Sequence, residues 1–199
     1  MKKYLKIIVI VLVVSLLVGC SLTYENEKKE YLRGQYNVEM KIKDYGIITL
    51  TLDADTAPIT VTNFMNLVKE GFYNNNKIHR AMKGFVIQGG SDSVGSKETI
   101  KGEFDANGIS NDISHVRGTI SMARMGDNHS NYDSASTQFF IVQEDSISLD
   151  HYYAGFGSVT SGMEVVDKIC DTIKNTDNMG MILDEDEMPI IEYIKEIEK

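Results

Sequence analysis

The sequence predicts one mostly β domain, a barrel or a sandwich, that carries two amphipathic helices. Three observations predict this fold class. Apolar and polar residues alternate along a hairpin near residue 45, short β-branched apolar runs recur between turn-forming clusters, and two stretches repeat apolar residues at helical spacing. A length of 199 residues, 42% of them apolar, suits one such domain.

The composition argues against several classes of protein. With only two prolines and two cysteines, the chain is neither a collagen nor a disulfide scaffold. Its 20 basic and 29 acidic residues give a formal charge of −9, whereas a protein that binds the phosphate backbone needs a basic patch. We therefore expect no nucleic-acid partner.

The first twenty residues differ in character from the rest. Three lysines lie within residues 1–6, and residues 7–18 are apolar except for Ser15. A helix needs about 20 residues to cross a hydrocarbon core of about 30 Å, so this shorter run predicts the apolar region of a signal peptide. An uncleaved membrane anchor is the alternative, and a buried core strand is disfavoured because only Ser15 interrupts the apolar run.

Residues 17–20, Leu-Val-Gly-Cys, resemble the bacterial lipobox. The resemblance implies that residues 1–19 are removed as a signal peptide and that lipid chains, palmitate among them, are attached to Cys20. Two lipid chains hold a protein stably on a membrane, whereas a single lipid chain binds only marginally. We expect a lipoprotein on the extracytoplasmic face of the cell membrane of a bacterium with a single membrane. Loss of the three lysines leaves 17 basic against 29 acidic residues, a charge of −12.

Residues 20–35 are polar and without period, which predicts a tether, and residues 36–199 form the expected folded domain. The domain starts with a hairpin. Alternation over residues 38–42 is followed by turn residues at 44–46, and the alternation resumes over residues 48–52.

Two stretches have the spacing of amphipathic helices. The first covers residues 58–69, with Pro58 suited to its first turn and Gly71 ending it. The second begins near Ser161, where Ser161 and Glu164 match the capping-box pattern.

Four further segments predict strands. The runs at residues 84–88, 118–123 and 138–143 are short, apolar and β-branched, and Gly, Ser, Asn and Asp clusters separate them. The last segment, residues 190–197, is expected to pair as a closing strand. Regular short strands of this kind indicate a barrel or a sandwich.

Two features have both a structural and a functional interpretation. The acidic residues 184–187 predict a solvated loop, with calcium binding as a weaker alternative because the ligand spacing of an EF-hand is missing. Cys170 is interpreted as a buried small apolar residue, with a reactive thiol as the alternative.

The sequence contains none of the common catalytic motifs. The histidines His79, His115, His129 and His151 lie far apart with no HExxH or CxxC pattern, so we expect no metal site. Residues 89–93 do not form a GxSxG elbow, and neither a P-loop nor a GxGxxG motif is present. A hydrolase or a nucleotide-dependent enzyme is not supported.

Five segments together are more specific than any one of them. They are residues 78–90, 118–124, 136–141, 149–150 and 156–157. In order and spacing they resemble the cyclophilin family of peptidyl-prolyl isomerases, and the likeness extends from about residue 36 to the C-terminus. The resemblance implies an eight-stranded closed antiparallel β-barrel capped by two α-helices, and an enzyme that needs no cofactor.

The resemblance also implies a set of site residues. Arg80 matches the catalytic arginine, with Gln88 and Phe85 as its catalytic partners. The expected substrate-binding residues are His79, Val86, Ala123, Arg124, Gln138, Phe140, Ser148, Leu149 and Tyr153.

The chain departs from the family pattern at several positions. Ser148 stands where a tryptophan is common, so we expect weak cyclosporin binding at most. Val86 replaces a frequent methionine and Tyr153 a frequent histidine. The segment between Arg124 and Gln138 is longer than in compact members, which predicts an extended loop beside the substrate groove.

These observations favour an isomerase that acts on Pro-containing segments of exported proteins and works as a monomer. Isomerisation breaks no bond, so it needs no nucleophile, metal or cofactor. Two alternatives remain: a chaperone or adaptor of the same fold with little catalysis, and a solute-binding lipoprotein of a transporter. The latter shares the anchor but needs two α/β lobes and predicts none of the five segments.

Overall fold

The predicted hairpin is formed by β1 (Gln35–Ile42) and β2 (Gly46–Asp53). In this computed structural model, which describes residues 30–92, 95–126 and 128–198, Val38 pairs with Leu50 and Met40 with Ile48. All four side chains are buried, as the alternation predicts. The turn has positive φ at Asp44, 64°, and at Gly46, 139°.

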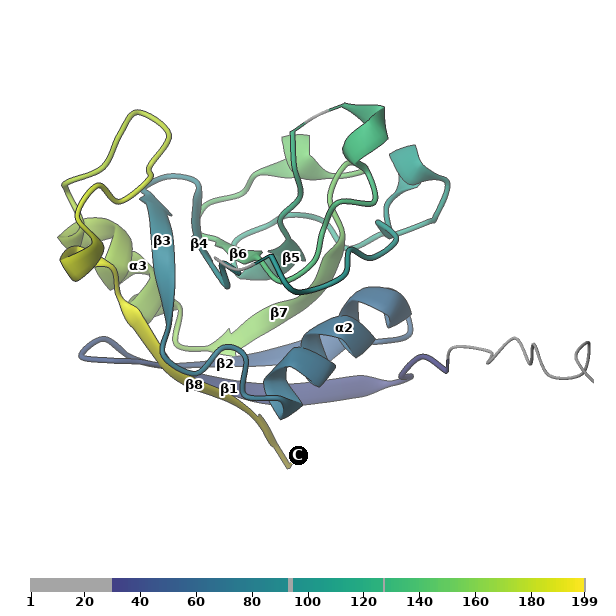
Figure 1. Cartoon of the computed structure of the whole chain (residues 1–199), viewed down its shortest axis with the longest axis horizontal. Coiled ribbons are helices and arrows are strands. Elements are labelled where there is room, and N and C mark those ends of the chain that lie inside the picture. Colours follow the sequence, from purple (N-terminus) through teal and green to yellow (C-terminus); the bar gives the residue numbers. More distant parts are fainter. Residues whose placement is uncertain (1–29, 93–94, 127, 199) are drawn as a thin grey trace, which may run out of the picture. The chain divides into compact units, whose positions relative to one another are not determined.

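The eight strands close into an antiparallel barrel with the order β1-β2-β7-β5-β6-β4-β3-β8 (Figure 1). This confirms the expected closed barrel. The remaining strands are β3 (Asn76–Met82), β4 (Val86–Gly89), β5 (Thr119–Met122), β6 (Phe139–Val142), β7 (Gly155–Ser161) and β8 (Ile190–Ile197).

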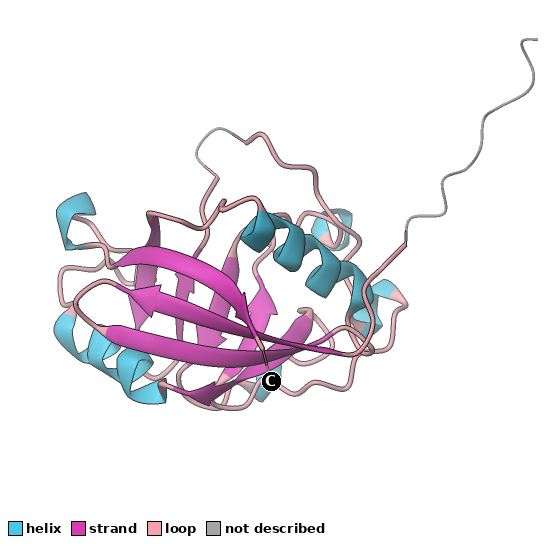
Figure 2. Cartoon of the chain, turned by 90° about the horizontal axis from the view of Figure 1, so that it is seen from below, coloured by secondary structure: helices cyan, strands magenta, loops and turns pink. Residues whose placement is uncertain are grey.

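Two helices, α2 (Pro58–Lys69) and α3 (Met163–Thr172), lie toward opposite ends of the barrel (Figure 2). The bounds of α2 agree with the sequence prediction. Its N-terminus has no cap from its own side chains; instead the buried carboxylate of Glu103 accepts hydrogen bonds from the N–H groups of Ile59, at 2.9 Å, and Thr60, at 2.8 Å. A distant segment therefore satisfies the free donors of the first turn.

The predicted capping box at the start of α3 is wrong. Ser161 ends β7 and pairs with Thr49, so it belongs to the barrel and not to the helix. Gly162 precedes the helix with φ 92°, and no side chain caps it. A Cβ at Gly162 would lie 2.2 Å from the carbonyl oxygen of Ile47, so only glycine fits this strand-to-helix turn.

Three other predictions can be compared with the fold. Cys170 is buried in the main core, and burial raises the pKa of its thiol to about 11, which fits a structural residue. The acidic residues 184–187 are exposed and include a short 3-10 helix, Glu185–Glu187. Leu32 packs against the core, so the folded part begins slightly before the predicted start at Tyr36.

The predicted signal peptide, residues 1–19, and the lipid attachment at Cys20 fall outside the described residues. Within the part of the chain that the structure describes, no helix is both long and apolar enough to span a bilayer.

Candidate active site

A cavity of about 390 Å³ opens on the outer face of the barrel, over β3, β4 and β6. It brings together all the predicted catalytic and substrate-binding residues except His79, Gln138 and Ser148. Its lining consists of Arg80, Phe85, Val86, Gln88, Ala123, Arg124, Gly126, Phe140, Leu149, Tyr153, Met179 and Met181.

The apolar floor of the cavity follows from strand alternation. Ile87, Phe139 and Ile141 point into the main core, so their neighbours point outward. Val86 and Phe140 are two of those neighbours, and they are buried in a second, separate apolar cluster. Phe85, Ala123, Leu149 and Tyr153 pack against this cluster.

Arg80 lies at the mouth of this apolar pocket, and its guanidinium contacts Met179, Gln88, Phe85 and the sulfur of Met82. Its Nε donates to the carbonyl oxygen of Met179 at 2.7 Å, its Nη1 donates to Oε1 of Gln88 at 3.3 Å, and its Cζ lies 5.4 Å from the centre of the Phe85 ring. Burial lowers the pKa of Arg80, but a guanidinium stays protonated at neutral pH. A fixed cation therefore borders an apolar cavity.

Gln138 lies just outside this lining and connects to it. The Nε2 of Gln88 donates to Oε1 of Gln138 at 2.9 Å, so Arg80, Gln88 and Gln138 form a chain of hydrogen bonds. Gln138 borders an adjoining cavity of about 320 Å³, which shares Gln88, Ala123 and Arg124 with the first. The two cavities therefore adjoin each other along these three residues.

His79 and Ser148 do not line the first cavity. The pairing of β3 with β4 shifts register between Ile78 and Arg80, and Ile78 and Ala81 both lie in the core, so His79 and Arg80 both point away from it. The His79 side chain lines a different cavity beside Leu183 and hydrogen-bonds the side chain of Gln138. Burial and the charge of Arg80 lower the pKa of His79. Ser148 is exposed on the 3-10 turn Ile147–Leu149, which turns Leu149, not Ser148, toward the cavity.

Arg124 is fixed as a wall between the two cavities. Its Nε donates to the carbonyl oxygen of Tyr152 at 2.9 Å, and its Nη1 donates to the carbonyl oxygen of Gly126. The guanidinium lies 4.5 Å from the Tyr153 ring centre and 5.1 Å from that of Tyr132. Tyr132 belongs to the predicted extended loop, so that loop packs against the site.

Below the pocket lies a buried hydrogen-bonded group that the sequence analysis missed. The Nδ1 of His115 is 2.8 Å from Oδ1 of Asp150, and its Nε2 is 3.0 Å from Oγ of Ser121. A carboxylate only accepts, so Nδ1 carries the proton in this pair. The His115 ring stacks on Phe140 with centroids 5.9 Å apart, and Asp150 directly follows Leu149.

Met179 and Met181 were also not predicted as lining residues. They come from the segment between α3 and β8, far along the chain from Arg80, and residues 174–189 have no apolar period that indicates a site.

From the sequence alone, His115 is considered only as a possible metal ligand. Burial lowers the pKa of His115, and this effect outweighs the hydrogen bond and negative charge of Asp150, which raise it.

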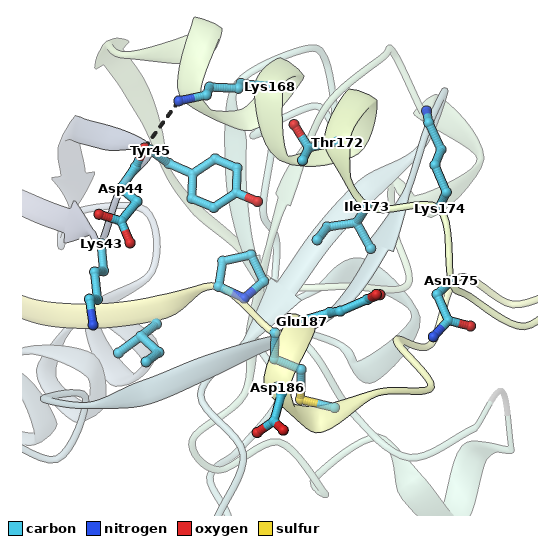
Figure 3. A pocket seen from close by; sticks show the side chains of 13 residues that line it. Lys43, Asp44, Tyr45, Lys168, Thr172, Ile173, Lys174, Asn175, Asp186 and Glu187 are labelled. Carbon is cyan, nitrogen blue, oxygen red and sulfur yellow. Dashed lines mark hydrogen bonds between the residues drawn. The ribbon is translucent and has the colours of Figure 1, made fainter.

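A larger cavity, of about 720 Å³, lies between the β1–β2 turn, the end of α3 and the chain entering β8 (Figure 3). Lysines and carboxylates share its lining, and Lys168 Nζ donates to the carbonyl oxygen of Asp44 at 3.1 Å. None of the predicted site residues borders it, so size alone does not make it the active site. Among the described residues, no group of three or more His, Cys, Asp or Glu could hold a metal.

Comparison with known proteins identifies the family of the chain. Residues 37–192 match the family model described as cyclophilin type peptidyl-prolyl cis-trans isomerase/CLD. Peptidyl-prolyl cis-trans isomerase A of Dickeya dadantii (strain 3937) is 41% identical over 151 residues, which cover 73% of this chain and 76% of that protein. Peptidyl-prolyl cis-trans isomerase B of Escherichia coli (strain K12) is 40% identical over 134 residues, or 63% of this chain and 79% of the relative.

Solved structures share the fold. A cyclophilin type peptidyl-prolyl cis-trans isomerase of Cryptosporidium parvum superposes with a TM-score of 0.69 over 83% of this chain and 99% of its own, at 24% identity. A structure of that isomerase in the presence of the dipeptide Ala-Pro gives a TM-score of 0.64, also at 24% identity, over 82% of this chain and 99% of its own. At this identity the likeness concerns the fold alone.

Barrel, site and relatives define one class, and the chain belongs to the cyclophilin-type peptidyl-prolyl cis-trans isomerase family. Its activity is the cis-trans isomerisation of X-Pro peptide bonds.

Proposed function

We propose that Arg80, Gln88 and Phe85 carry this isomerisation and that the apolar cavity holds the proline ring of the substrate. The observation that carries the proposal is the guanidinium of Arg80, fixed at the mouth of a cavity whose floor is Val86 and Phe140. Leu149 and Tyr153 complete the walls.

The chemistry needed is the stabilisation of a twisted amide. Rotation about an X-Pro bond breaks amide resonance and costs about 18–20 kcal/mol. At the twisted transition state the proline nitrogen regains its lone pair and becomes a better hydrogen-bond acceptor. The protonated guanidinium of Arg80 donates to that nitrogen, a contact that the planar ground state does not offer and that therefore lowers the barrier.

The lowering of the activation barrier can be divided between the Arg80 hydrogen bond and the apolar cavity. An acceleration of about five decades corresponds to about 7 kcal/mol. One charge-assisted hydrogen bond supplies about 1.5–3 kcal/mol of this. The cavity supplies the rest, because it holds the ring while the preceding chain turns and excludes water that stabilises the planar amide.

The adjoining cavity suits the residue that precedes proline. Ala123 and Arg124 separate the two cavities, and Gln138 borders the second. A chain whose proline occupies the first cavity would extend past Ala123 into the second. We assign the binding of this residue to Ala123, Arg124 and Gln138.

A direct test is NMR exchange spectroscopy on Ala-Pro peptides with wild type, Arg80→Ala and, as a matched control, Arg117→Ala. Arg117 is a surface arginine that pairs with Asp167 at 2.6 Å and does not line the cavity. We expect wild type and Arg117→Ala to accelerate exchange and Arg80→Ala to lose most of the acceleration. Equal rates for wild type and Arg80→Ala contradict the assignment.

The rival role, a chaperone or adaptor of the same fold, predicts binding without turnover. The same NMR experiment distinguishes the two roles. If the protein only binds, Pro-containing peptides shift its resonances, but their cis-trans exchange stays at the uncatalysed rate. The fixed arginine favours the enzyme, since a pocket that only binds proline does not need a cation at its mouth.

We also propose where the enzyme works. The signal-like residues 1–19 and the lipobox-like sequence ending at Cys20 support a lipid-anchored protein on the outer face of the cell membrane, whose substrates are exported chains that fold there. The mature charge of −12 favours a domain that stands off from an anionic membrane. A monomer suffices, because the site is built from one chain, and the exposed Ser148 supports weak cyclosporin binding at most.

Expression of wild type and Cys20→Ala in a bacterial host, followed by membrane fractionation and mass analysis, tests the anchor. Wild type should stay in the membrane fraction with a lipid-modified N-terminus, and Cys20→Ala should lose the lipid. Retention of an unlipidated protein of mature size would contradict the proposal.

A further inference from the structure

The segment that precedes β8 adds a short extra strand to the outer edge of β3, beside the catalytic arginine. Met181 forms an antiparallel bridge with Arg80. The N–H of Ala81 donates to the carbonyl oxygen of Gly180 at 2.9 Å, and the N–H of Ile182 donates to that of His79 at 3.0 Å. Residues 179–182 are therefore bound to β3 through backbone hydrogen bonds.

The turn that leads into this strand is held in place. Oδ1 of Asp177 accepts hydrogen bonds from the N–H groups of Met179, at 2.8 Å, and Met181, at 2.9 Å. Gly180 has φ 81°, and a Cβ there would lie 2.7 Å from Cβ of Met82. The segment is thus a built wall of the site.

Strand alternation divides the side chains of this segment between two faces. Ile182 is buried in the main core, whereas Met179 and Met181 line the catalytic cavity. The two methionines are 61% and 38% exposed, respectively. Large apolar side chains left open to solvent beside a binding site indicate contact with a ligand.

The position of these methionines relative to the two cavities determines which part of a substrate they meet. Arg80 and Gln88 separate them from the end where Ala123 and Arg124 lead into the second cavity. That second end holds the residue before proline in the proposed function. A chain that crosses the cavity therefore leaves past Met179 and Met181 with the residue that follows proline.

We propose that Met179 and Met181 form a subsite for the residue after proline and that this subsite favours a large apolar side chain, such as leucine, over glycine. The inference rests on the proposed function for the direction of the bound chain. Methionine is flexible and polarizable, so two methionines accept apolar side chains of several shapes. Unfolded chains present such side chains, whereas folded proteins bury them.

The subsite is tested with Met179→Ser/Met181→Ser against two peptides, Ala-Ala-Pro-Leu and Ala-Ala-Pro-Gly. Serine removes the apolar side chains but keeps the carbonyl of residue 179 that binds Arg80, since that contact belongs to the backbone. Leu183→Ser is the matched control, because Leu183 belongs to the same segment and is 65% exposed but does not line this cavity. NMR exchange gives kcat/KM without a coupling protease that has its own preference.

We expect wild type to prefer the leucine peptide. In the double variant, the ratio of kcat/KM for the leucine peptide to that for the glycine peptide should fall about fivefold, equivalent to about 1 kcal/mol. The Leu183→Ser variant should keep the wild-type ratio. An unchanged ratio in the double variant overturns the inference, and so does an equal fall in Leu183→Ser.

A second readout separates this inference from the proposed function. In protein labelled with 13C at the methionine methyl groups, the leucine peptide should shift the signals of Met179 and Met181 more than the glycine peptide does. The buried Met40 and Met65 serve as internal references. If wild type fails to catalyse but these shifts appear, the isomerase assignment fails and the subsite stands; if it catalyses without them, the subsite is refuted.

Discussion

Replacing His115 with leucine tests whether the buried hydrogen-bonded group of His115, Asp150 and Ser121 supports the cavity that we propose to bind proline. The His115 side chain is fully buried and bonds both Asp150 and Ser121. Leucine fills similar space but bonds neither. Asp150 would keep its bonds from Ser114 Oγ at 2.6 Å and from the backbone N–H of residue 115 at 2.7 Å, whereas the buried Ser121 hydroxyl would lose this partner.

The expected loss follows from these contacts. The charge-assisted bond from His115 to Asp150 contributes about 1.5–3 kcal/mol, and an unsatisfied buried hydroxyl at Ser121 costs about 1–3 kcal/mol. Burial of the more apolar leucine offsets about 1 kcal/mol. The free energy of unfolding should therefore fall by about 3 kcal/mol, a large share of the 5–15 kcal/mol typical of a domain.

The same residue makes stability depend on pH. Burial lowers the pKa of His115 in the folded protein, so the unfolded chain binds a proton more readily. The stabilisation is complete above the unfolded pKa of about 6.5 and is lost as pH falls through the lower folded value. Wild type should lose stability between pH 7.5 and 5.5, and His115→Leu should lose less, while His79, whose pKa is also lowered, still contributes in both proteins.

Urea denaturation followed by circular dichroism at several pH values measures both effects. Peptide titration of the folded variant adds a readout of the pocket, because Phe140 loses the ring on which it stacks. An unfolding free energy within 1 kcal/mol of wild type, together with an unchanged pH slope, refutes the reasoning.

Three further predictions concern stability and reactivity. Glu103→Ala removes the acceptor for two N–H groups at the start of α2 and should cost about 2–4 kcal/mol in urea denaturation, with Glu103→Gln in between; a near-neutral alanine variant contradicts the cap. Gly162→Ala should cost at least about 2 kcal/mol, clearly more than Gly108→Ala, which has positive φ but no atom within 4 Å of a Cβ; equal losses would mean that the close approach is unimportant. With its pKa raised to about 11, Cys170 should resist alkylation at pH 7.5 until the protein unfolds, as peptide mapping by mass spectrometry detects; rapid labelling of the native protein would restore the reactive-thiol interpretation.

The elements that sequence patterns predicted are those specified locally. The hairpin over residues 35–53 and helix α2 have regular periods, turn residues and a proline at the helix start, and the structure reproduces them. In β7, glycines at 155 and 157 interrupt the apolar pattern, because other segments approach there: a Cβ at Gly157 would lie 2.4 Å from the carbonyl oxygen of Thr51. Tertiary contact, not local propensity, makes this segment a strand.

The residues of the candidate site also fall into two groups: those that lie together in one sequence motif, and those that tertiary pairing brings to the site. Arg80, Phe85 and Gln88 lie in one motif, so a resemblance located them together. Met179 reaches the site because residues 179–182 pair with β3, and no local pattern encodes that pairing. The capping-box prediction failed for a related reason, since pairing with Thr49 keeps Ser161 in the barrel.

The central claim is that the fixed guanidinium of Arg80 drives the rotation of the X-Pro bond. The most direct measurement compares the catalysed exchange rate of an Ala-Pro peptide with wild type, Arg80→Lys and Arg117→Lys. Lysine keeps the charge but lacks the planar fork that binds Gln88 and the carbonyl of Met179 while donating to the proline nitrogen. We predict a loss of about 10- to 100-fold for Arg80→Lys and wild-type rates for Arg117→Lys. Wild-type catalysis by Arg80→Lys, or an equal loss in both variants, would contradict the account.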